Sequence, residues 1–397
     1  MIHQSTIKKH KLELPFFLYD FKKISQQYLS LKKFFPKNIH IFYFAKANPN
    51  AQILKAYKSL GSGVEVSSFN ELKNVLEIGF SPKNVILVGP GKTNDVLKLA
   101  LKKRIYLIIA ESTTEIKRID KIAGKQKIKQ DILIRVNPLD FDSKSNSKFS
   151  MVGNNRKFGI DEEKIPNIIK RVWKLNNVNI VGLHFFTGSY IYDERFFIRN
   201  TRYLFKLVCF LESNSKIFLP IINIGGGFPL NHYVFPNRLF DIKNLYKGLK
   251  DLVKQYGFEN RTILFESGRF LVGKSGEYIV EVIDVKKSRN EKFVIINGGI
   301  NHISLGALKR NGHEVEIIGK KGNKKEVVNI VGNLCLPMDF ITKTKLPNVK
   351  IGDIISIKKV GAYGLTSGMI LFSSYRIPDE YILVNNRPKR INNKIRA

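Results

Sequence analysis

The sequence predicts an α/β protein built from a (β/α)8 barrel and a C-terminal all-β domain. Two observations favour this fold class. Between residues 39 and 265 of the 397-residue chain, short apolar runs alternate with helical stretches, and from about Phe270 onward strand-like runs and glycine turns replace the helices. Eight strands with intervening helices are what a closed parallel barrel requires. A doubly wound open sheet is the structural alternative for the first part.

The predicted barrel strands are short and apolar, as expected of parallel strands that are buried on both faces. They cover residues 39–44, 64–67, 85–88, 105–109, 132–136, 181–186, 221–224 and 262–265. Helices are predicted between them over residues 51–60, 68–79, 94–101, 162–175 and 196–212. In the β-rich part, strands are predicted over residues 277–286, 292–297, 327–331, 353–360 and 381–384.

The composition is that of a folded protein with a sizeable core, since 43% of residues are hydrophobic and 11% aromatic. No apolar run approaches the roughly 20 residues of a membrane-spanning helix, and the N-terminus lacks the apolar segment and cleavage site of a secretory signal. We therefore expect a soluble, cytoplasmic protein without a membrane partner. The two cysteines, Cys209 and Cys335, lie far apart without CxxC spacing, which argues against a disulfide framework or a zinc site, so no metal is expected.

The formal net charge of +34 raises the question of nucleic-acid binding. The basic residues are spread along the chain among many Asn and Ile residues, and no compact basic helix or aromatic RNA-binding signature is present. We interpret much of the charge as a compositional bias and expect no nucleic-acid partner. A diffuse positive surface would also steer an acidic protein partner toward the molecule.

Lys46 ends an aromatic, strand-like run, Tyr43-Phe44-Ala45-Lys46, which is an unusual place for a solvated charge. Burial disfavours the ammonium form and leaves a fraction of free amine, which can condense with an aldehyde to form a Schiff base. The alternative is a lysine at a strand end whose ammonium group extends to water.

Further chemical motifs fall where predicted strands end, which in a parallel barrel is the face on which catalytic residues converge. Glycines 225–227 would let backbone N–H groups approach a phosphate, although a flexible turn is equally compatible. Glu266 precedes Arg269 and supplies a carboxylate beside a cation, with a structural ion pair as the alternative. The segment 182–189 could pack a ring against a flat ligand and bind phosphate through Ser189, or be a core strand in which His184 is a buried histidine.

Two loops of the β-rich part carry a thiol and a phenol, Cys335 within residues 332–339 and Tyr363 within residues 361–365. Each is compatible with ordinary core packing when taken alone.

Taken in order, these segments resemble the motifs of the fold-type III pyridoxal phosphate decarboxylases, the family of ornithine, diaminopimelate and arginine decarboxylases. The resemblance extends from about Leu14 to Leu383. It rests on residues 44–48, 63–68 with Glu71 and Leu72, 89–92, 157–159, 184–189, 225–228 and 266–269, together with Cys335 and residues 361–363. Nine collinear motifs are far more specific than any one of them.

The resemblance implies an alanine-racemase-like barrel over residues 20–270 that binds pyridoxal phosphate, and a β domain made of residues 1–19 and 271–397. Lys46 would bind the cofactor covalently, Glu266 would face its pyridine nitrogen, and Cys335 would act as an acid in the neighbouring subunit of a homodimer. The residues implied to surround the cofactor are Lys46, Glu65, Arg135, Phe186, Ser189, Gly225, Gly226, Gly227, Glu266, Gly268, Arg269 and Tyr363.

Departures from the family pattern concern the substrate. Phe186 stands where basic amino-acid decarboxylases have a histidine, and Asn297 and Leu336 stand where they have acids. An ammonium group facing leucine would lose its hydration without compensation, so diamine-type substrates are disfavoured. Leu305 aligns with the arginine that binds the distal carboxylate in diaminopimelate decarboxylases, which puts that substrate in doubt as well.

A narrower similarity points to the subgroup that acts on amino acids tethered to acyl carrier proteins and to its exosortase-associated relatives. It is carried by residues 136–138, 150–153, 157–159, 185–189, 335–339 and 361–366. We therefore expect a pyridoxal phosphate-dependent decarboxylase of an L-amino acid or derivative, free or carrier-bound. Diaminopimelate or another free diamino acid is the alternative substrate. A non-catalytic regulator of the same fold, a racemase and a nucleic-acid binder are less favoured alternatives.

Overall fold

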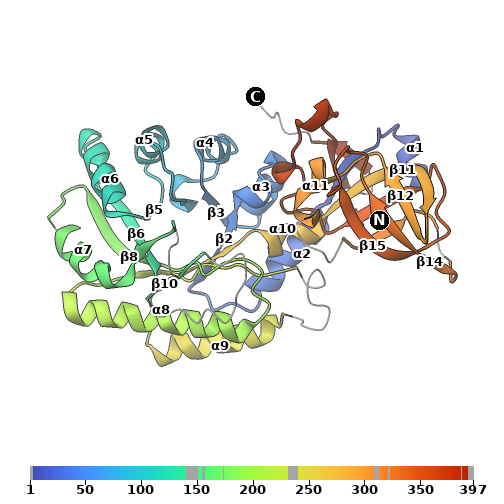
Figure 1. Cartoon of the computed structure of the whole chain (residues 1–397). Coiled ribbons are helices and arrows are strands. Elements are labelled where there is room, and N and C mark those ends of the chain that lie inside the picture. Colours follow the sequence, from blue (N-terminus) through green and yellow to red (C-terminus); the bar gives the residue numbers. More distant parts are fainter. Residues whose placement is uncertain are drawn as a thin grey trace.

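A computed structural model describes residues 3–139, 151–153, 157–172, 174–230, 240–307, 313–320, 322–385 and 387–391, with side chains omitted for residues 304–307. Figure 1 shows two parts: a barrel surrounded by helices, and a β domain that also holds the N-terminus. No helix among the described residues is both long and apolar enough to cross a bilayer.

The first part is a closed barrel of eight parallel strands. They are β2 (Ile39–Phe44), β3 (Gly63–Val66), β4 (Val85–Leu87), β5 (Leu107–Ala110), β6 (Gln130–Asn137), β8 (Val178–His184), β9 (Ile221–Asn223) and β10 (Thr262–Ser267). Closure is complete because β10 pairs with β2 and β5 pairs with β6. The barrel prediction is confirmed, and the open sheet is excluded. Each predicted barrel strand overlaps an observed one.

The barrel helices follow the strands and cover the outside of the barrel (Figure 1). They are α2 (Phe21–Lys32), α3 (Ala51–Ser59), α4 (Phe69–Glu77), α5 (Asn94–Lys102), α6 (Thr113–Lys125), α7 (Ile165–Val172), α8 (Glu194–Ser215) and α9 (Ile242–Gln255), with the short α10 (Arg269–Val272) after β10. Five of them match predicted helices. Helices α2, α6, α9 and α10 are additions to the prediction.

Side-chain caps start four successive barrel helices close behind the strand ends. Asn50, Ser68, Thr93 and Ser112 each accept a hydrogen bond from a backbone N–H group in the first turn of α3, α4, α5 and α6. Such caps satisfy N–H groups that have no partner within the helix. The loops between strand and cap therefore stay short and hold their side chains at the carboxyl face of the barrel.

The second part is a β domain in which β1 is a central strand. Its strands are β1 (Phe16–Asp20), β11 (Gly276–Ser288), β12 (Glu291–Ile296), β13 (Val315–Ile317), β14 (Lys325–Val331), β15 (Phe340–Pro347), β16 (Ile354–Lys358), β17 (Asp379–Val384) and β18 (Arg387–Arg390). The sheet runs β15-β14-β12-β11-β1-β17-β18, and β16 pairs with β11 and β13. Helices α1 (Gln4–Lys9) and α11 (Ile300–Ala307) flank it. Strands β1, β13, β15 and β18 were not predicted.

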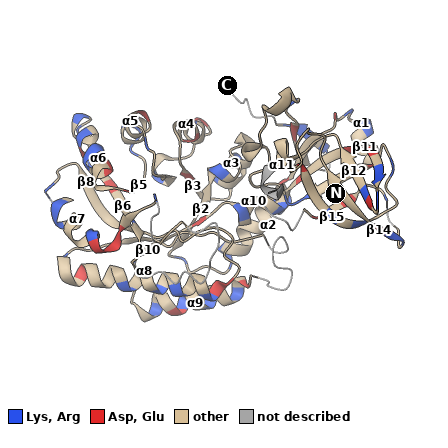
Figure 2. Ribbon diagram, viewed as in Figure 1, with Lys and Arg blue, Asp and Glu red and all other residues tan. Residues whose placement is uncertain are grey.

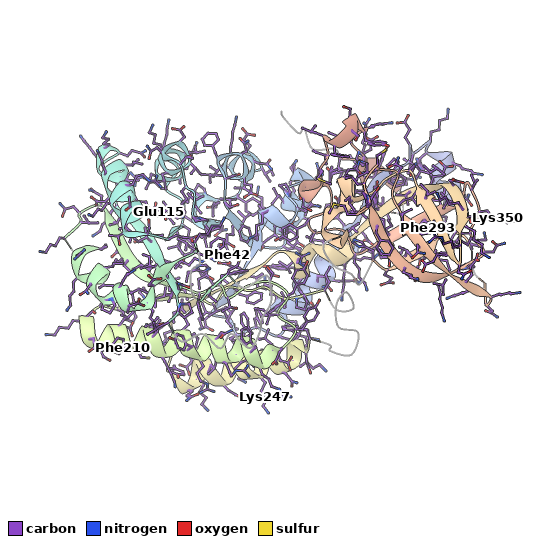
Figure 3. The ribbon with its side chains drawn as sticks, viewed as in Figure 1. Phe42, Glu115, Phe210, Lys247, Phe293 and Lys350 are labelled. Atoms are coloured by element: carbon purple, nitrogen blue, oxygen red, sulfur yellow. The ribbon has the colours of Figure 1, made fainter. Side chains whose placement is uncertain are left out.

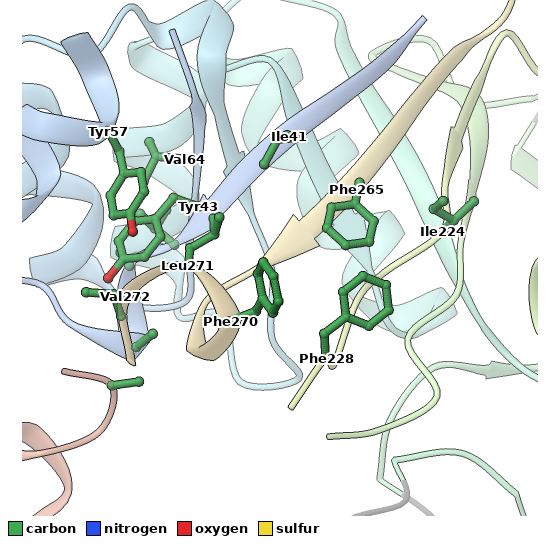
Figure 4. Close-up of a cluster of buried hydrophobic side chains, with 14 of the residues drawn as sticks. Ile41, Tyr43, Tyr57, Val64, Ile224, Phe228, Phe265, Phe270, Leu271 and Val272 are labelled. Carbon is green, nitrogen blue, oxygen red and sulfur yellow. The ribbon is translucent and has the colours of Figure 1, made fainter. Parts of the chain in front are cut away.

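Aromatic packing outside the barrel wall holds β2 and β10 in place (Figure 4). Phe265 lies 4.9 Å from Phe228 between ring centroids, and Tyr43 stacks on Tyr57 at 3.9 Å. Phe265 is fully buried, as are Tyr43 and Tyr57. Because β2 and β10 are paired neighbours, this core fixes the relative position of the residues that follow the two strands.

Candidate active site

A pocket opens where the carboxyl ends of β2, β8, β9 and β10 meet. It is lined by Phe44, Lys46, Phe186, Ser189, Gly227, Phe228, Glu266, Ser267, Gly268, Arg269 and Tyr363. Nine of these belong to the residues that the family resemblance places around a cofactor or to the motif that carries Lys46. The structure thus brings together residues that are more than 300 positions apart in the sequence.

Lys46 lies in the single turn η1 (Ala45–Ala47), directly after β2. Its Nζ atom lies 3.8 Å from the centre of the Phe44 ring and 5.9 Å from that of Phe186. Burial lowers the pKa of Lys46, and Glu65 and Glu266 oppose that shift without cancelling it. A larger fraction of the amine is therefore neutral than in an exposed lysine, which favours its use as a nucleophile.

The β domain holds the segment that carries Lys46. The backbone N–H group of Tyr363 donates to the Ala47 carbonyl at 2.7 Å, and the Asn48 amide donates to the Gly361 carbonyl at 3.0 Å. The Asn50 amide donates to Glu380 at 3.1 Å. Folding of the β domain is therefore coupled to the position of Lys46 in the barrel.

Glu266, at the end of β10, is a buried carboxylate with two close partners. Its Oε1 atom lies 3.0 Å from Nε2 of His184 and accepts a hydrogen bond from the Asn223 amide at 2.7 Å. Burial raises the pKa of Glu266, but its neighbours, His184 foremost, together outweigh burial, so the pKa lies below its usual value. Glu266 is thus suited to remain an anion facing a protonated ring nitrogen.

Glu65, on β3, is the opposite case. Among the described residues neither of its carboxyl oxygens has a hydrogen-bond partner, although the residue is only 1% exposed. Burial and the nearby charge of Glu266 raise its pKa well above the usual value. A buried carboxyl without a partner is costly, and such a group is expected beside a ligand that completes its hydrogen bonds.

The glycines after β9 are closely packed and do not form a loose turn. A Cβ atom on Gly226 would lie 1.7 Å from the Glu266 carbonyl oxygen, and one on Gly227 would lie 2.0 Å from the Gly188 carbonyl oxygen. Gly225 and Gly227 also have positive φ angles of 65° and 99°. Only glycine allows β9 to end so close to the ends of β8 and β10, and the resulting cradle leaves backbone N–H groups at the pocket.

Arg269 lies between two tyrosines at the start of α10. Its guanidinium carbon is 4.3 Å from the centre of the Tyr190 ring and 4.6 Å from that of Tyr363. Burial raises the pKa of Tyr363 to about 12, with Arg269 acting in the opposite direction. At neutral pH the pocket therefore presents a guanidinium and a phenol, both suited to bind phosphate oxygens. Gly268 keeps the chain close to Lys46, because a Cβ atom there would lie 2.8 Å from that of Ala47.

Arg135, on β6, is fixed by an ion pair with Glu111. Its Nη1 atom donates to Glu111 at 2.9 Å, and its guanidinium carbon lies 4.6 Å from the centre of the Phe158 ring and 6.0 Å from that of Phe186. Its Nε and Nη2 atoms are buried without a hydrogen-bond partner among the described residues. Like Glu65, Arg135 offers unsatisfied polar atoms beside the pocket.

Of the described site residues predicted in the β domain, Tyr363 lines the pocket, whereas Cys335, Leu336 and Asn297 do not. Cys335 is exposed, in the loop between β14 and β15, and is not among the described residues that line the pocket. Leu336 packs partly buried against the core, and the Asn297 side chain accepts a hydrogen bond from the backbone N–H group of Glu281 at 2.9 Å. The Leu305 side chain lies outside the described residues.

The sequence reasoning missed several contributors. His184 is a buried histidine, as one interpretation held, but its contact with Glu266 could not be inferred before β8 and β10 were brought together. Asn223 and Tyr190 were not singled out, although each lies within a few residues of a motif that was, and Glu111 follows a predicted strand without a motif beside it.

This set of groups matches the chemistry of pyridoxal phosphate. An amine with a lowered pKa suits the aldehyde, an anionic carboxylate suits the pyridinium, and a glycine cradle with Arg269 and a phenol suits the phosphate. The partnerless atoms of Glu65 and Arg135 also fit a pocket that a polar ligand completes. No group of three or more potential metal ligands occurs among the described residues.

Comparison with known proteins agrees with this interpretation. Residues 21–273 match the family model described as "Pyridoxal-dependent decarboxylase, pyridoxal binding domain". The chain is 31% identical to the L-glutamyl-[BtrI acyl-carrier protein] decarboxylase of Niallia circulans, covering 97% of this chain and 92% of that protein. It is 31% identical to the diaminopimelate decarboxylase of Campylobacter jejuni, covering 90% and 88%.

A solved structure gives the same result in three dimensions. The diaminopimelate decarboxylase of Helicobacter pylori, complexed with L-lysine, superimposes with a TM-score of 0.88 at 30% sequence identity, covering 97% of this chain and 95% of that chain. The resemblance seen in the sequence motifs is therefore confirmed by the family model, by relatives that span nearly the whole chain and by the shared fold. This protein belongs to the family of pyridoxal phosphate-dependent decarboxylases.

Proposed function

We propose that this decarboxylase removes the α-carboxylate of an L-amino acid or amino-acid derivative that is tethered to an acyl carrier protein. The observation that carries the proposal is the apolar character of Phe186, which lines the pocket, and of Leu336. The family resemblance implies a histidine and an acid at these positions in decarboxylases of basic amino acids. A distal thioester arm carries no charge, so it needs no ionic partner in the pocket. The similarity to a decarboxylase of a carrier-bound glutamyl group supports the same choice.

Lys46 and Glu266 have the main roles at the cofactor. Lys46 would hold the cofactor through its amine at the aldehyde, and the Glu266 carboxylate would face the ring nitrogen and favour its protonated form. When bound, pyridoxal phosphate supplies an electron sink for the electron pair left as carbon dioxide departs. His184 and Asn223 keep Glu266 ionised through their contacts at 3.0 and 2.7 Å.

The backbone N–H groups of residues 225–227, the Ser189 hydroxyl, Arg269 and Tyr363 would hold the phosphate. All but the first two glycines line the pocket. Phe186 would pack on the ring, and Gly268 would leave room for the chain to pass beside it. Glu65 and Arg135 would complete their hydrogen bonds with the ligand that fills the pocket.

Cys335 is proposed to return a proton to the reacting carbon in the other subunit of a homodimer. Its exposure in the isolated chain and the exposed side chain of Met338 in the same loop support a contact with a second subunit. Mixing the inactive variants Lys46→Ala and Cys335→Ala tests this assignment. Shared sites should restore about a quarter of the wild-type activity, because half of the dimers are mixed and each of those has one intact site. No recovery in subunits shown to exchange would contradict it.

Carbon dioxide release is the direct test of the substrate. We expect turnover of an L-glutamyl or similar aminoacyl thioester on an acyl carrier protein, and little turnover of free diaminopimelate, lysine or ornithine. Efficient turnover of a free diamino acid, with none of any carrier-bound substrate, would refute the carrier proposal and leave the cofactor assignment intact.

Diaminopimelate is the second candidate substrate. It is favoured by the similarity to diaminopimelate decarboxylases of known structure and sequence. The assay panel above separates the two.

The charge of the molecule is compatible with a carrier partner. Figure 2 shows Lys and Arg on helices of the barrel and on strands of the β domain, interspersed with fewer acidic residues. A positive surface speeds encounter with an acidic protein, in a salt-dependent manner. We also propose a cytoplasmic location, where carrier proteins and free pyridoxal phosphate meet.

A further inference from the structure

A buried network of four charged side chains lies behind Arg135. The side chains of Lys92 and Glu115 are 0% and 5% exposed and form an ion pair at 2.9 Å, and those of Arg135 and Glu111 are 6% and 3% exposed and form another at 2.9 Å. Two cations and two carboxylates balance in charge. Lys92 belongs to a motif that the sequence resemblance included but to which no function was assigned.

Lys92 is anchored by three hydrogen bonds. Its Nζ atom donates to the Gly89 carbonyl at 2.7 Å, to the Ile109 carbonyl at 2.6 Å and to Oε1 of Glu115 at 2.9 Å. An ammonium group has three N–H donors, so each has an acceptor. Burial lowers the pKa of Lys92, and Glu115 opposes that shift. The site therefore satisfies every donor of the Lys92 ammonium group.

The two carboxylates connect Lys92 to Arg135. Oε2 of Glu115 accepts from the backbone N–H group of Glu111 at 2.7 Å. Glu111 in turn accepts from Arg135 through Oε1 and from the backbone N–H group of Gly159 through Oε2, at 2.9 and 3.1 Å. Glu115 lies on α6 at the edge of the barrel (Figure 3). The chain of bonds thus links the segments that follow β4, β5 and β6.

Stability alone is a poor explanation for this network, because well-packed apolar residues often replace a buried ion pair without loss. The two ends of the network differ in how completely their hydrogen bonds are satisfied. The Lys92 end is saturated with partners, whereas at the other end Nε and Nη2 of Arg135 have none among the described residues and lie beside Phe186, which lines the pocket. Hydrogen bonds of this kind, made on the side away from the ligand, keep a ligand-binding group in one orientation.

We infer that Lys92 is a positioning residue for the reaction: through Glu115 and Glu111 it orients the Arg135 guanidinium and the Phe158-Gly159 segment at the cofactor pocket. The inference rests on the proposed cofactor site. Without Lys92, Glu111 and Glu115 are two neighbouring carboxylates with Arg135 as their nearest cation in the network. Arg135 is then drawn toward them and away from the pocket.

The test compares Lys92→Met with the double variant Lys92→Met/Glu115→Gln. The first leaves a surplus buried negative charge, and the second removes it while keeping an oxygen that can accept from the Glu111 N–H group. We expect Lys92→Met to lower kcat about tenfold, the lower end of what losing an outer partner costs at a buried site. KM and the amount of bound cofactor should stay near wild type, and the double variant should regain most of the lost kcat.

A purely structural role predicts the opposite order, because the double variant has lost more bonds. The inference is overturned if folded, cofactor-loaded Lys92→Met has a kcat within about twofold of wild type, or if the double variant is as slow as the single one. If Lys92→Met does not fold, Glu111→Gln must show the same loss of kcat with cofactor retained. Lys98→Met, which removes an exposed pair with Asp95 on α5, is the control and should leave kcat unchanged. Wild-type protein that neither binds the cofactor nor releases carbon dioxide would instead refute the proposed function.

Discussion

Gly226 shows how closely the strand ends are packed at the site. A Cβ atom added there would lie 1.7 Å from the Glu266 carbonyl oxygen and 2.8 Å from the carbonyl carbon, whereas real Cβ atoms essentially never come within 3.0 Å of such atoms. The obstacle is backbone, so no side-chain rotation relieves it. Gly226→Ala must therefore move the end of β9 away from β10 by more than about 1 Å.

Such a displacement acts directly on Glu266. Its backbone N–H group donates to the Gly225 carbonyl at 2.9 Å, and its carboxylate depends on Asn223 at the end of β9. A misplacement of about 1 Å at an active site can cost about 100-fold in rate, and overpacking of this kind typically costs about 1–3 kcal/mol of stability. We expect Gly226→Ala to lower kcat/KM about 100-fold and to lower the free energy of unfolding by about 1–3 kcal/mol.

The assay measures carbon dioxide release at saturating pyridoxal phosphate and, in parallel, unfolding by denaturant. Gly91→Ala is the control, because a Cβ atom there meets nothing within 4 Å and its φ is outside the left-handed region. If Gly226→Ala retained wild-type kcat/KM and stability, the close packing of β9 against Glu266 would be refuted.

Three further predictions concern the phosphate site, the cysteine loop and the β domain. Tyr363→Phe should weaken cofactor affinity about tenfold. In the wild type, ionisation of Tyr363 should not lower that affinity until the pH nears the Tyr363 pKa of about 12. Equilibrium titration of the apoenzyme with the cofactor checks both expectations. Asp339 accepts hydrogen bonds from the backbone N–H groups of Ile300 and Leu334 at 2.8 Å, so Asp339→Ala should loosen the Cys335 loop and lower kcat while the absorbance of bound cofactor is unchanged. Burial raises the pKa of Glu277, but Lys358 and Lys23 outweigh burial and lower it. The pair of Glu277 and Lys358 therefore stabilises the fold fully above the ordinary glutamate pKa, and this stabilisation is lost as the pH falls through the lowered pKa. Lys358→Met should lower the free energy of unfolding by about 1–3 kcal/mol at neutral pH and by progressively less in acid. Denaturant unfolding across pH measures this difference.

The barrel could be predicted because its strands are short apolar runs buried on both faces, a pattern that depends on few distant contacts. Elements whose burial depends on partners were harder to predict. Strand β1 lies far from its partner strands in the sequence and becomes central only because β11 and β17 pair with it. Strand β15 (Phe340–Pro347) carries two lysines and is stabilised by pairing with β14. The extra helices α6 and α9 are polar on one face, and caps at Ser112 and Asp241 mark their starts.

For the site, residues in contiguous motifs were predictable and residues that act through another element were not. Lys46, Glu266 and the glycines after β9 each stand at a strand end, where the fold class itself places chemistry. His184 and Asn223 are recognised as site residues only through their contacts with Glu266 on a different strand. Lys92 is recognised only through its contacts with β5 and α6. Charge pairing across closed barrel strands is a tertiary property that sequence spacing does not encode.

The covalent attachment site of the cofactor is the most direct test of the account. Borohydride reduction of the loaded enzyme fixes the bond between cofactor and lysine, and mass spectrometry of the peptides then identifies the modified residue. We expect the cofactor mass on Lys46 alone, and no activity or visible cofactor absorbance in Lys46→Ala. Attachment to another lysine, or an active Lys46→Ala enzyme, would contradict the proposed site.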